Sequence, residues 1–282
     1  MDSNLECLSP SPSSPHWDPL VKNNVNVVGR LDAVRTIVCV HGFGTDQTAW
    51  RDVQAPFLAE FRIVLLDNVG AGKTPAEAFE QHRYLDLHQY ATDLLEVCDA
   101  LAVQGAVLVG HSVGAMIGVL AALRQPSRFS RLVLIGSSPR YLNDTGYEGG
   151  FSEEQLNGLY STMSSSYEEW ADQFAPQVMR NDHRPALAQQ FAANIKSIPP
   201  ERALTVLCSI FQSDHRSDIQ KLPHPTLLIH GEDDIAVPIA VAHYLNRHIA
   251  GSQLAIIEAE GHLPHISAPA EVLRAMHDFV VA

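Results

Sequence analysis

The stretch Gly110-His111-Ser112-Val113-Gly114 decides the fold of this chain. It follows the apolar run Ala106-Val107-Leu108-Val109 and precedes the small-residue run Ala115-Met116-Ile117-Gly118-Val119-Leu120-Ala121-Ala122. The first run predicts a buried strand and the second predicts a helix, so the chain must turn sharply between them. A serine at such a turn has a strained backbone, and side chains two residues to either side would collide with the neighbouring strand and helix.

The composition favours a globular protein that binds no nucleic acid. With 282 residues, of which 46% are hydrophobic, the chain can form one large α/β domain or two small ones. The formal net charge is -13 and no basic run is present, which argues against a nucleic-acid partner. An acidic surface mostly serves solubility, so it says little about the substrate.

The cysteines and the N-terminal sequence indicate a reducing compartment. The sequence has four cysteines, Cys7, Cys39, Cys98 and Cys208, and none of them forms a C-x-x-C pair. Two of the four lie in apolar runs, where a buried thiol is expected. No basic region followed by an apolar one opens the sequence, so we expect no signal peptide. No apolar stretch is long enough to span a bilayer. We therefore expect a cytoplasmic protein without a membrane partner.

Most of the chain alternates short β-branched runs with longer helical segments. Residues 1–19, rich in Ser and Pro, are predicted to be a disordered tail, and residues 20–282 a single domain. Strands are predicted at 34–40, 62–66, 106–109, 132–135, 226–229 and 254–257, and a helix at 85–101. Continuous apolar strands alternating with helices indicate a mostly parallel sheet covered by helices on both faces.

Residues 145 to about 200 interrupt this alternation. They carry polar helical segments with scattered aromatic residues and no strong strand. An insertion here would lie at the carboxyl end of the sheet, beside Ser112, where ligands of open α/β sheets bind. We therefore predict that it forms a lid.

The strand, the G-x-S-x-G turn and the helix resemble the nucleophile elbow of α/β-hydrolases, in which a serine precedes an acid and then a histidine. The strand ending at His230 leads into Asp233 and Asp234, and the next strand leads into His262. We predict Ser112 as nucleophile, His262 as general base and Asp234 as the acid that orients it. Asp233 is the rival for the last role, because the two aspartates are adjacent and their side chains point differently.

No metal or cofactor site is expected. His262 and His265 have a spacing that could bind a metal, with Glu258 or Glu260 as a carboxylate ligand, but no second ligand cluster accompanies them. His265 is expected to pack near the site or to cap the following helix. The run 70–74 resembles the end of a P-loop but lacks its first glycine, so nucleotide binding is not expected.

The loop His41-Gly42-Phe43-Gly44 follows the first predicted core strand and matches the H-G-x-G pattern that hydrolases use to bind an oxyanion. The oxyanion that forms on serine attack needs backbone N–H donors aimed at it. We predict Phe43 and Val113 as these donors. The ring of Phe43 would also line the pocket.

Seven motifs, in order, resemble one subfamily of these hydrolases from about Val25 to the C-terminus. They are similar to the RsbQ-type hydrolases of bacterial stress signalling and to the plant strigolactone and karrikin receptors. Gly114, together with the segment 214–216, is closer to the bacterial branch, since the plant receptors more often carry serine at the position of Gly114. The motifs are His41-Gly42-Phe43-Gly44-Thr45-Asp46-Gln47, Asp67-Asn68-Val69-Gly70-Ala71-Gly72, Gly110-His111-Ser112-Val113-Gly114-Ala115-Met116-Ile117-Gly118, Ser138-Pro139-Arg140-Tyr141-Leu142-Asn143-Asp144, Gly149-Gly150-Phe151, Ile210-Phe211-Gln212-Ser213-Asp214 and Gly261-His262-Leu263-Pro264-His265.

The resemblance implies an α/β-hydrolase fold with a four-helix, V-shaped lid over a deep apolar pocket. Gln177 stands where relatives often have an apolar residue, so a more polar pocket rim is expected. Several lid aromatics are also expected to hold the lid helices together. The lining that the resemblance implies is Phe43, Tyr141, Phe151, Leu159, Tyr167, Trp170, Phe174, Ile210, Phe211 and Ala236.

Two functions from different classes follow from these expectations. The first is a serine hydrolase that acts on a small apolar ester or lactone through a covalent Ser112 intermediate, in a signalling role like that of RsbQ. The second is a ligand receptor in which slow hydrolysis sets a lid state read by a partner. The resemblance implies a sensor-domain phosphatase or an F-box protein as that partner. A haloperoxidase or a C–C bond hydrolase could share the scaffold, but an aspartate-nucleophile dehalogenase is excluded by Ser112.

Overall fold

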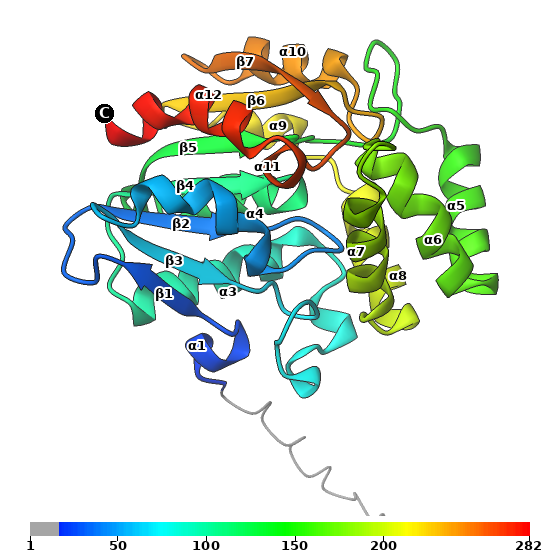
Figure 1. Cartoon of the computed structure of the whole chain (residues 1–282), viewed down its shortest axis with the longest axis horizontal. Helices are drawn as coiled ribbons and strands as arrows, with labels where there is room; N and C mark the ends of the chain where they lie inside the picture. Colours follow the sequence, from blue (N-terminus) through cyan, green and yellow to red (C-terminus); the bar gives the residue numbers. More distant parts are fainter. Residues whose placement is uncertain (1–16) are drawn as a thin grey trace, which may run out of the picture.

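A single sheet of seven strands organises the computed structural model, which describes residues 17–282 (Figure 1). The strand order is β1-β3-β2-β4-β5-β6-β7, with β1 antiparallel to β3 and the other neighbours parallel. The mostly parallel sheet predicted from the sequence is therefore confirmed. The strands are β1 (Asn26–Gly29), β2 (Thr36–Val40), β3 (Arg62–Leu66), β4 (Ala106–His111), β5 (Phe129–Ile135), β6 (Thr226–Asp233) and β7 (Gln253–Glu260).

Apolar side chains on both faces of the central strands hold the layers together. In β2, Val38 and Val40 belong to one buried cluster, whereas Ile37 and Cys39 belong to the cluster on the opposite face. This division follows from the alternation of side chains along a strand. Because both faces need cover, the central strands read as continuous apolar runs rather than as alternating ones.

Helices cover each face. α3 (Leu87–Ala100), α4 (Val113–Arg124) and α10 (Ile239–His248) contribute to the cluster around Val38, and α2 (Arg51–Gln54) and α12 (Pro269–Val281) contribute to the cluster around Ile37. The remaining short helices are α1 (Pro19–Lys22), α9 (Arg216–Ile219) and α11 (Pro264–Ser267). Within residues 17–282, no helix is long and apolar enough to cross a membrane.

The N-terminal part differs from the sequence prediction. Of the predicted tail, residues 1–19, the first sixteen lie outside the described residues. Of the remaining three, Trp17 packs against the core and Asp18 caps α1. The buried Lys22 ties α1 to α3 through an ion pair with Asp93, with 2.9 Å between Nζ and Oδ1. Strand β1 was not predicted, because it is short, half-exposed and at the sheet edge, where the apolar signal is weakest.

Four helices between β5 and β6 form the inserted layer, which lies at the right of Figure 1. The first begins with a capping box, in which Ser152 and Gln155 each accept a hydrogen bond from the other's backbone N–H. The last ends at Phe211, beyond the end near residue 200 that the sequence suggested. The four are α5 (Glu153–Ser165), α6 (Tyr167–Met179), α7 (Pro185–Lys196) and α8 (Pro200–Phe211), hereafter the lid.

The turn between β4 and α4 leaves no room for a side chain at either of its glycines in this backbone. Ser112 has φ 53° and ψ -123°, a conformation that side chains rarely adopt. A Cβ atom on Gly114 would lie 2.3 Å from the Val40 carbonyl oxygen, and one on Gly110 would lie 2.5 Å from the Ala115 Cα. The predicted collision with the neighbouring strand and helix is therefore confirmed.

Substituting Gly110 with alanine tests this close approach. Gly110→Ala is expected to lower the free energy of unfolding by about 3 kcal/mol or more, because the α4 backbone at Ala115 cannot yield to the new methyl group. Gly158→Ala is the matched control, since nothing lies within 4 Å of its Cβ position. On the exposed face of α5 this control is expected to stabilise the protein by about 0.5–1 kcal/mol. Urea unfolding measures both, and equal stabilities would contradict the expectation.

Candidate active site

Three loops at the carboxyl edge of the sheet bring Ser112, Asp234 and His262 together. Ser112 follows β4, Asp234 follows β6 and His262 lies two residues after β7. Because the three strands are parallel, their carboxyl ends lie at one edge. The residues predicted as nucleophile, acid and base therefore meet in space although up to 150 positions separate them.

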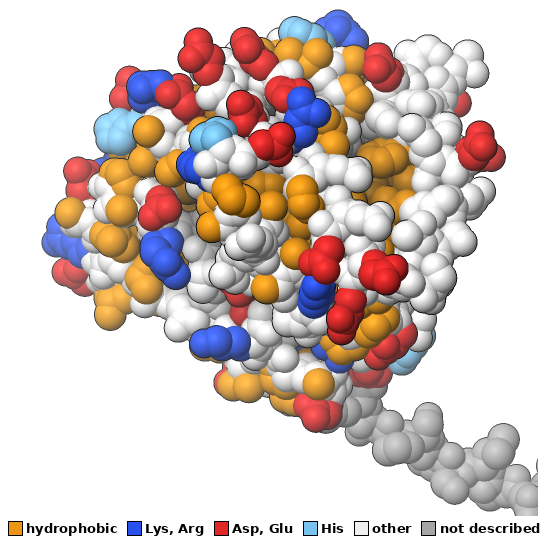
Figure 2. All heavy atoms as spheres, turned by 45° about the vertical axis from the view of Figure 1, so that its right-hand side comes forward, with side chains coloured by type: hydrophobic (Ala, Val, Ile, Leu, Met, Phe, Trp, Pro, Cys, Tyr) orange, Lys and Arg blue, Asp and Glu red, His pale blue; other side chains and the backbone are white. Residues whose placement is uncertain are grey.

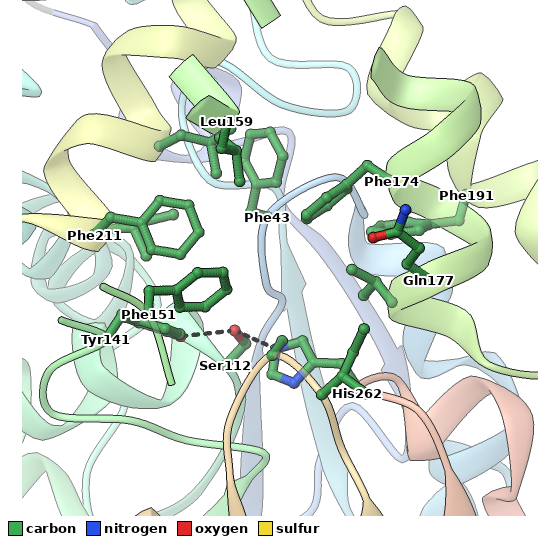
Figure 3. Close-up of a pocket in the computed structure, with 15 residues that line it drawn as sticks. Phe43, Ser112, Tyr141, Phe151, Leu159, Phe174, Gln177, Phe191, Phe211 and His262 are labelled. Atoms are coloured by element: carbon green, nitrogen blue, oxygen red, sulfur yellow. Dashed lines mark hydrogen bonds between the residues drawn. The ribbon is translucent and has the colours of Figure 1, made fainter. Parts of the chain in front are cut away.

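The three side chains form a continuous hydrogen-bonded chain. The distance from Ser112 Oγ to His262 Nε2 is 2.8 Å (Figure 3), and that from His262 Nδ1 to Asp234 Oδ2 is 2.7 Å. Since a carboxylate only accepts, Nδ1 carries the proton and Nε2 is free to accept the hydroxyl proton of Ser112. All three residues are at least 92% buried, so little of this chain is exposed at the protein surface.

Asp234 is held as a carboxylate by its surroundings. Its Oδ1 accepts hydrogen bonds from the backbone N–H groups of Ala236 (2.9 Å) and Val237 (3.0 Å). Burial raises the pKa of Asp234, but His262 and these hydrogen bonds outweigh it and hold that pKa below its usual value. Asp233 points elsewhere: its carboxylate pairs with Arg180 at the surface, 2.7 Å away.

The backbone N–H groups predicted as oxyanion donors belong to Val113 and Phe43. Val113 is the first residue of α4, so its N–H has no partner inside the helix. Phe43 lies in the loop after β2, which needs glycines on both sides: a Cβ on Gly42 would meet the ring of His111 at 2.5 Å, and Gly44 has φ 72°. Among residues 17–282 no hydrogen bond from the Phe43 or Val113 N–H is found.

A buried histidine fixes the loop that carries Phe43. The Nε2 atom of His41 accepts the N–H of Asn68 at 2.9 Å, which places the ring proton on Nδ1. This Nδ1 then donates to the Gly42 carbonyl oxygen at 2.8 Å. The loop is thereby connected to the neighbouring segment after β3.

Two further histidines hold the other loops in the same way. His111 Nε2 donates to the backbone oxygen of His262 at 2.7 Å, and His230 Nε2 donates to that of Val237 at 2.9 Å. The His262 N–H in turn donates to the carbonyl of Val178 in the lid helix α6, at 2.8 Å. The sequence did not predict these three hydrogen bonds, because each joins segments that come together only when the chain folds.

These histidines stay neutral. Burial lowers the pKa of His41, His111 and His230, and it lowers that of His265 to about 3. His265 is completely buried, with its ring 4.9 Å from that of Trp50. Neither of its ring nitrogens has a hydrogen-bond partner within the described part of the chain. His265 thus packs behind the site, which was one of the two roles expected for it.

A cavity of about 160 Å³ opens above Ser112, between the sheet edge and the lid (Figure 3). At 10–15 Å³ for each water, this volume holds on the order of ten water molecules, which sets the scale of a ligand at a small molecule. Figure 2 shows hydrophobic side chains in a recess on this side of the molecule. The lining is Phe43, Ser112, Tyr141, Phe151, Leu159, Phe174, Gln177, Val178, Phe191, Leu207, Ile210, Phe211, Ile235, Ala236 and His262.

Two of the ten lining residues implied by the resemblance lie elsewhere. Tyr167 donates its hydroxyl to the Ile195 carbonyl and so joins α6 to α7. Trp170 is buried and stacks on Tyr167 and Phe174 of its own helix. The remaining eight do line it: Phe43, Tyr141, Phe151, Leu159, Phe174, Ile210, Phe211 and Ala236. Gln177 brings the only side-chain amide to the lining, and apolar residues not foreseen complete it: Val178, Phe191, Leu207 and Ile235.

The comparisons with known proteins agree with this architecture. The profile of a family described as alpha/beta hydrolase fold matches residues 35–269. The chain belongs to the α/β-hydrolase family. A solved structure of a hydrolase from Oleispira antarctica superposes with a TM-score of 0.90 at 31% identity, covering 94% of this chain and 96% of that one.

Plant proteins are among its relatives at about 40% identity. Strigolactone esterase D14 of Arabidopsis thaliana is 42% identical over 250 residues, which cover 88% of this chain and 92% of that protein. Karrikin insensitive 2 receptor CA of Petunia hybrida is 38% identical over 265 residues, covering 92% and 97%. These proteins support the plant side of the resemblance.

Neutral, buried His265 predicts a pH dependence of stability. Its pKa is about 3 in the fold and about 6.5 in the unfolded chain. The unfolded chain therefore binds the proton first, and the free energy of unfolding falls as the pH drops below about 6.5, by up to ~1.4 kcal/mol per pH unit. Replacing His265 with leucine is expected to flatten this slope between pH 6.5 and 4.5 by about that amount.

Urea unfolding at several pH values measures the slope. His82→Leu, at a side chain that is 77% exposed, is the matched control and is expected to leave the slope unchanged. Parallel profiles for the parent and His265→Leu would contradict the neutral, buried state of this imidazole.

Proposed function

We propose that the protein is a serine hydrolase that cleaves a small, largely apolar ester or lactone through an acyl intermediate on Ser112. The observation that carries this proposal is the buried chain from Ser112 through His262 to Asp234, at the floor of an apolar cavity. A serine hydroxyl becomes a nucleophile when an adjacent base can take its proton, and this arrangement supplies the base and a carboxylate that orients it.

The reaction has two halves. In the first, Ser112 Oγ attacks the carbonyl carbon while its proton passes to His262 Nε2, and the proton then goes to the departing oxygen. In the second, water gives its proton to His262 and attacks the acyl carbon, and the proton finally returns to Ser112. Asp234 stabilises the imidazolium in both halves. The N–H groups of Phe43 and Val113 are the donors for the oxyanion.

The cavity and the family support an apolar ester or lactone. Most of the lining is aromatic or aliphatic, so an apolar group on either side of the carbonyl replaces water at a gain in free energy. One of the relatives is named an esterase. Within this proposal the hydrolase serves signalling, in the manner of RsbQ.

A receptor role is the second candidate, favoured by the relatives that are named receptors. In that role hydrolysis would be slow, and a partner such as an F-box protein or a sensor-domain phosphatase would read the lid state. Two features of the lid support a receptor role: the Val178 carbonyl of α6 accepts the His262 N–H, and residues of α5 to α8 line the cavity. A change at the site would therefore reach the lid surface directly.

Ser112→Ala separates the two candidates. The variant is expected to lose at least about a thousandfold in kcat/KM on p-nitrophenyl butyrate, because among residues 17–282 only the Ser112 hydroxyl is hydrogen-bonded to His262 Nε2. Non-hydrolysed ligands should still raise its melting temperature as they do in the parent. Ser165→Ala, on the exposed end of α5, is the control and should retain full activity. Turnover that survives Ser112→Ala would rule out the hydrolase proposal, and a biological role that survives it would favour the receptor.

A pair of adjacent aspartates tests the assignment of the acid. Asp234→Asn removes the acceptor that fixes the His262 tautomer and is expected to lower kcat by roughly a thousandfold or more. Asp233→Asn removes only an exposed ion pair with Arg180 and is expected to change kcat less than about threefold. Steady-state kinetics on the same ester compares them, and the reverse order would assign the role to Asp233.

A further inference from the structure

Ser112 has a second close neighbour besides His262. The hydroxyl oxygen of Tyr141 lies 3.2 Å from Ser112 Oγ, and in Figure 3 the tyrosine and the histidine approach this oxygen from opposite sides. Tyr141 is 4% exposed, and among residues 17–282 its hydroxyl has no other hydrogen-bond partner. The reacting atom is thus flanked by two groups, of which only one has a role in the mechanism above.

The direction of the Tyr141 hydrogen bond follows from the rest of the chain. His262 Nδ1 donates to Asp234, so Nε2 must accept the single proton of Ser112. The remaining hydrogen bond at Ser112 Oγ can then only be donated by Tyr141. Burial raises the pKa of Tyr141 far above neutrality, which keeps its hydroxyl protonated and able to donate.

The tyrosine is held in place from behind. Its ring meets that of Phe211 edge-on at 5.3 Å, and its backbone oxygen accepts the N–H of Phe151 at 3.1 Å. On either side of it, Arg140 pairs with Asp214 at 2.9 Å and Asp144 pairs with Arg216 at 2.7 Å. The hydroxyl is therefore presented to Ser112 by a fixed loop, not by a freely rotating side chain.

We propose that Tyr141 is a catalytic residue that assists the breakdown of the acyl-enzyme. This inference rests on the proposed function of Ser112. In the second half of the reaction, water adds to the acyl carbon with its proton going to His262. The bond between that carbon and Ser112 Oγ then breaks, its electron pair goes to Oγ, and His262 returns the proton there. Tyr141 donates a hydrogen bond to Oγ while this charge develops.

The same hydrogen bond contributes less to the first half. In the free enzyme Tyr141 already donates to the hydroxyl of Ser112, so the bond is present both before and during attack. In the acyl-enzyme, Oγ is an ester oxygen, which is a weaker acceptor, and the bond strengthens only as Oγ leaves. Only an interaction that is stronger in the transition state than in the ground state accelerates a step. Tyr141 is therefore expected to act on deacylation selectively.

Pre-steady-state kinetics of Tyr141→Phe tests the proposal. With p-nitrophenyl butyrate in a stopped-flow instrument, the burst phase is expected to change less than about threefold. The steady-state phase should slow about tenfold, in line with the loss of one hydrogen bond to a charged group. Intact-mass spectrometry of quenched samples should show an acyl adduct on Ser112 that is more abundant than in the parent.

Two further variants complete the test. Tyr160→Phe is the matched control: Tyr160 also faces the ring of Phe211, at 6.4 Å, but its hydroxyl has no bond to Ser112, so both phases should stay as in the parent. 3-Fluorotyrosine at position 141 keeps the shape and gives a more acidic donor, so it should match or exceed the parental deacylation rate even if Tyr141→Phe folds poorly.

The outcomes separate this inference from the proposed function. If Tyr141→Phe slows the burst and the steady phase equally, or neither, or if fluorotyrosine slows deacylation, the catalytic role of Tyr141 is overturned while Ser112 keeps its own. If the parent itself forms no adduct and Ser112→Ala retains turnover, the proposed function fails instead.

Discussion

The close approach of strand β4 to the first turn of α4 at Gly110 is the constraint on which the rest of the site depends. With no side chain there, the Ala115 Cα and the Gly114 carbonyl can lie where a Cβ atom would otherwise be. This contact lets the chain turn sharply enough to place Ser112 at φ 53° above the sheet edge. The nucleophile and the free N–H of Val113 are consequences of the same turn, so position and electrostatics are set together.

The polar site is surrounded by neutral groups. Asp234 is the only group of the triad that carries a charge in the resting state, and two backbone N–H groups and His262 compensate it. The histidines that brace the loops add donors without adding charge, because burial keeps them unprotonated. The imidazolium that forms during the reaction therefore meets one carboxylate, and the described residues that line the cavity include no Lys or Arg.

The sequence predicted those parts of the structure that depend on local pattern. The parallel strands appeared as continuous apolar runs, and Ser112, Asp234 and His262 stood directly after three of them, where edge geometry alone brings them together. Edge strand β1 escaped prediction because its burial is partial. Tyr167 and Trp170 could not be placed from sequence either, since a lid aromatic faces the cavity or a neighbouring helix depending on helix rotation. The hydrogen bond between Tyr141 and Ser112 depends on a loop held by ion pairs distant in sequence.

The hydrogen bond from the His262 N–H to the Val178 carbonyl couples the position of the lid to that of the catalytic base. Helix α6 ends one residue after Val178, and the carbonyls of Val178 and Met179 occupy the space that a side chain on Gly261 would need. A rigid outward swing of α6 would therefore pull on the very segment that presents the imidazole. A ligand can therefore enter with the triad aligned only if the lid bends elsewhere, and the segment around Val178 stays fixed to the catalytic loop.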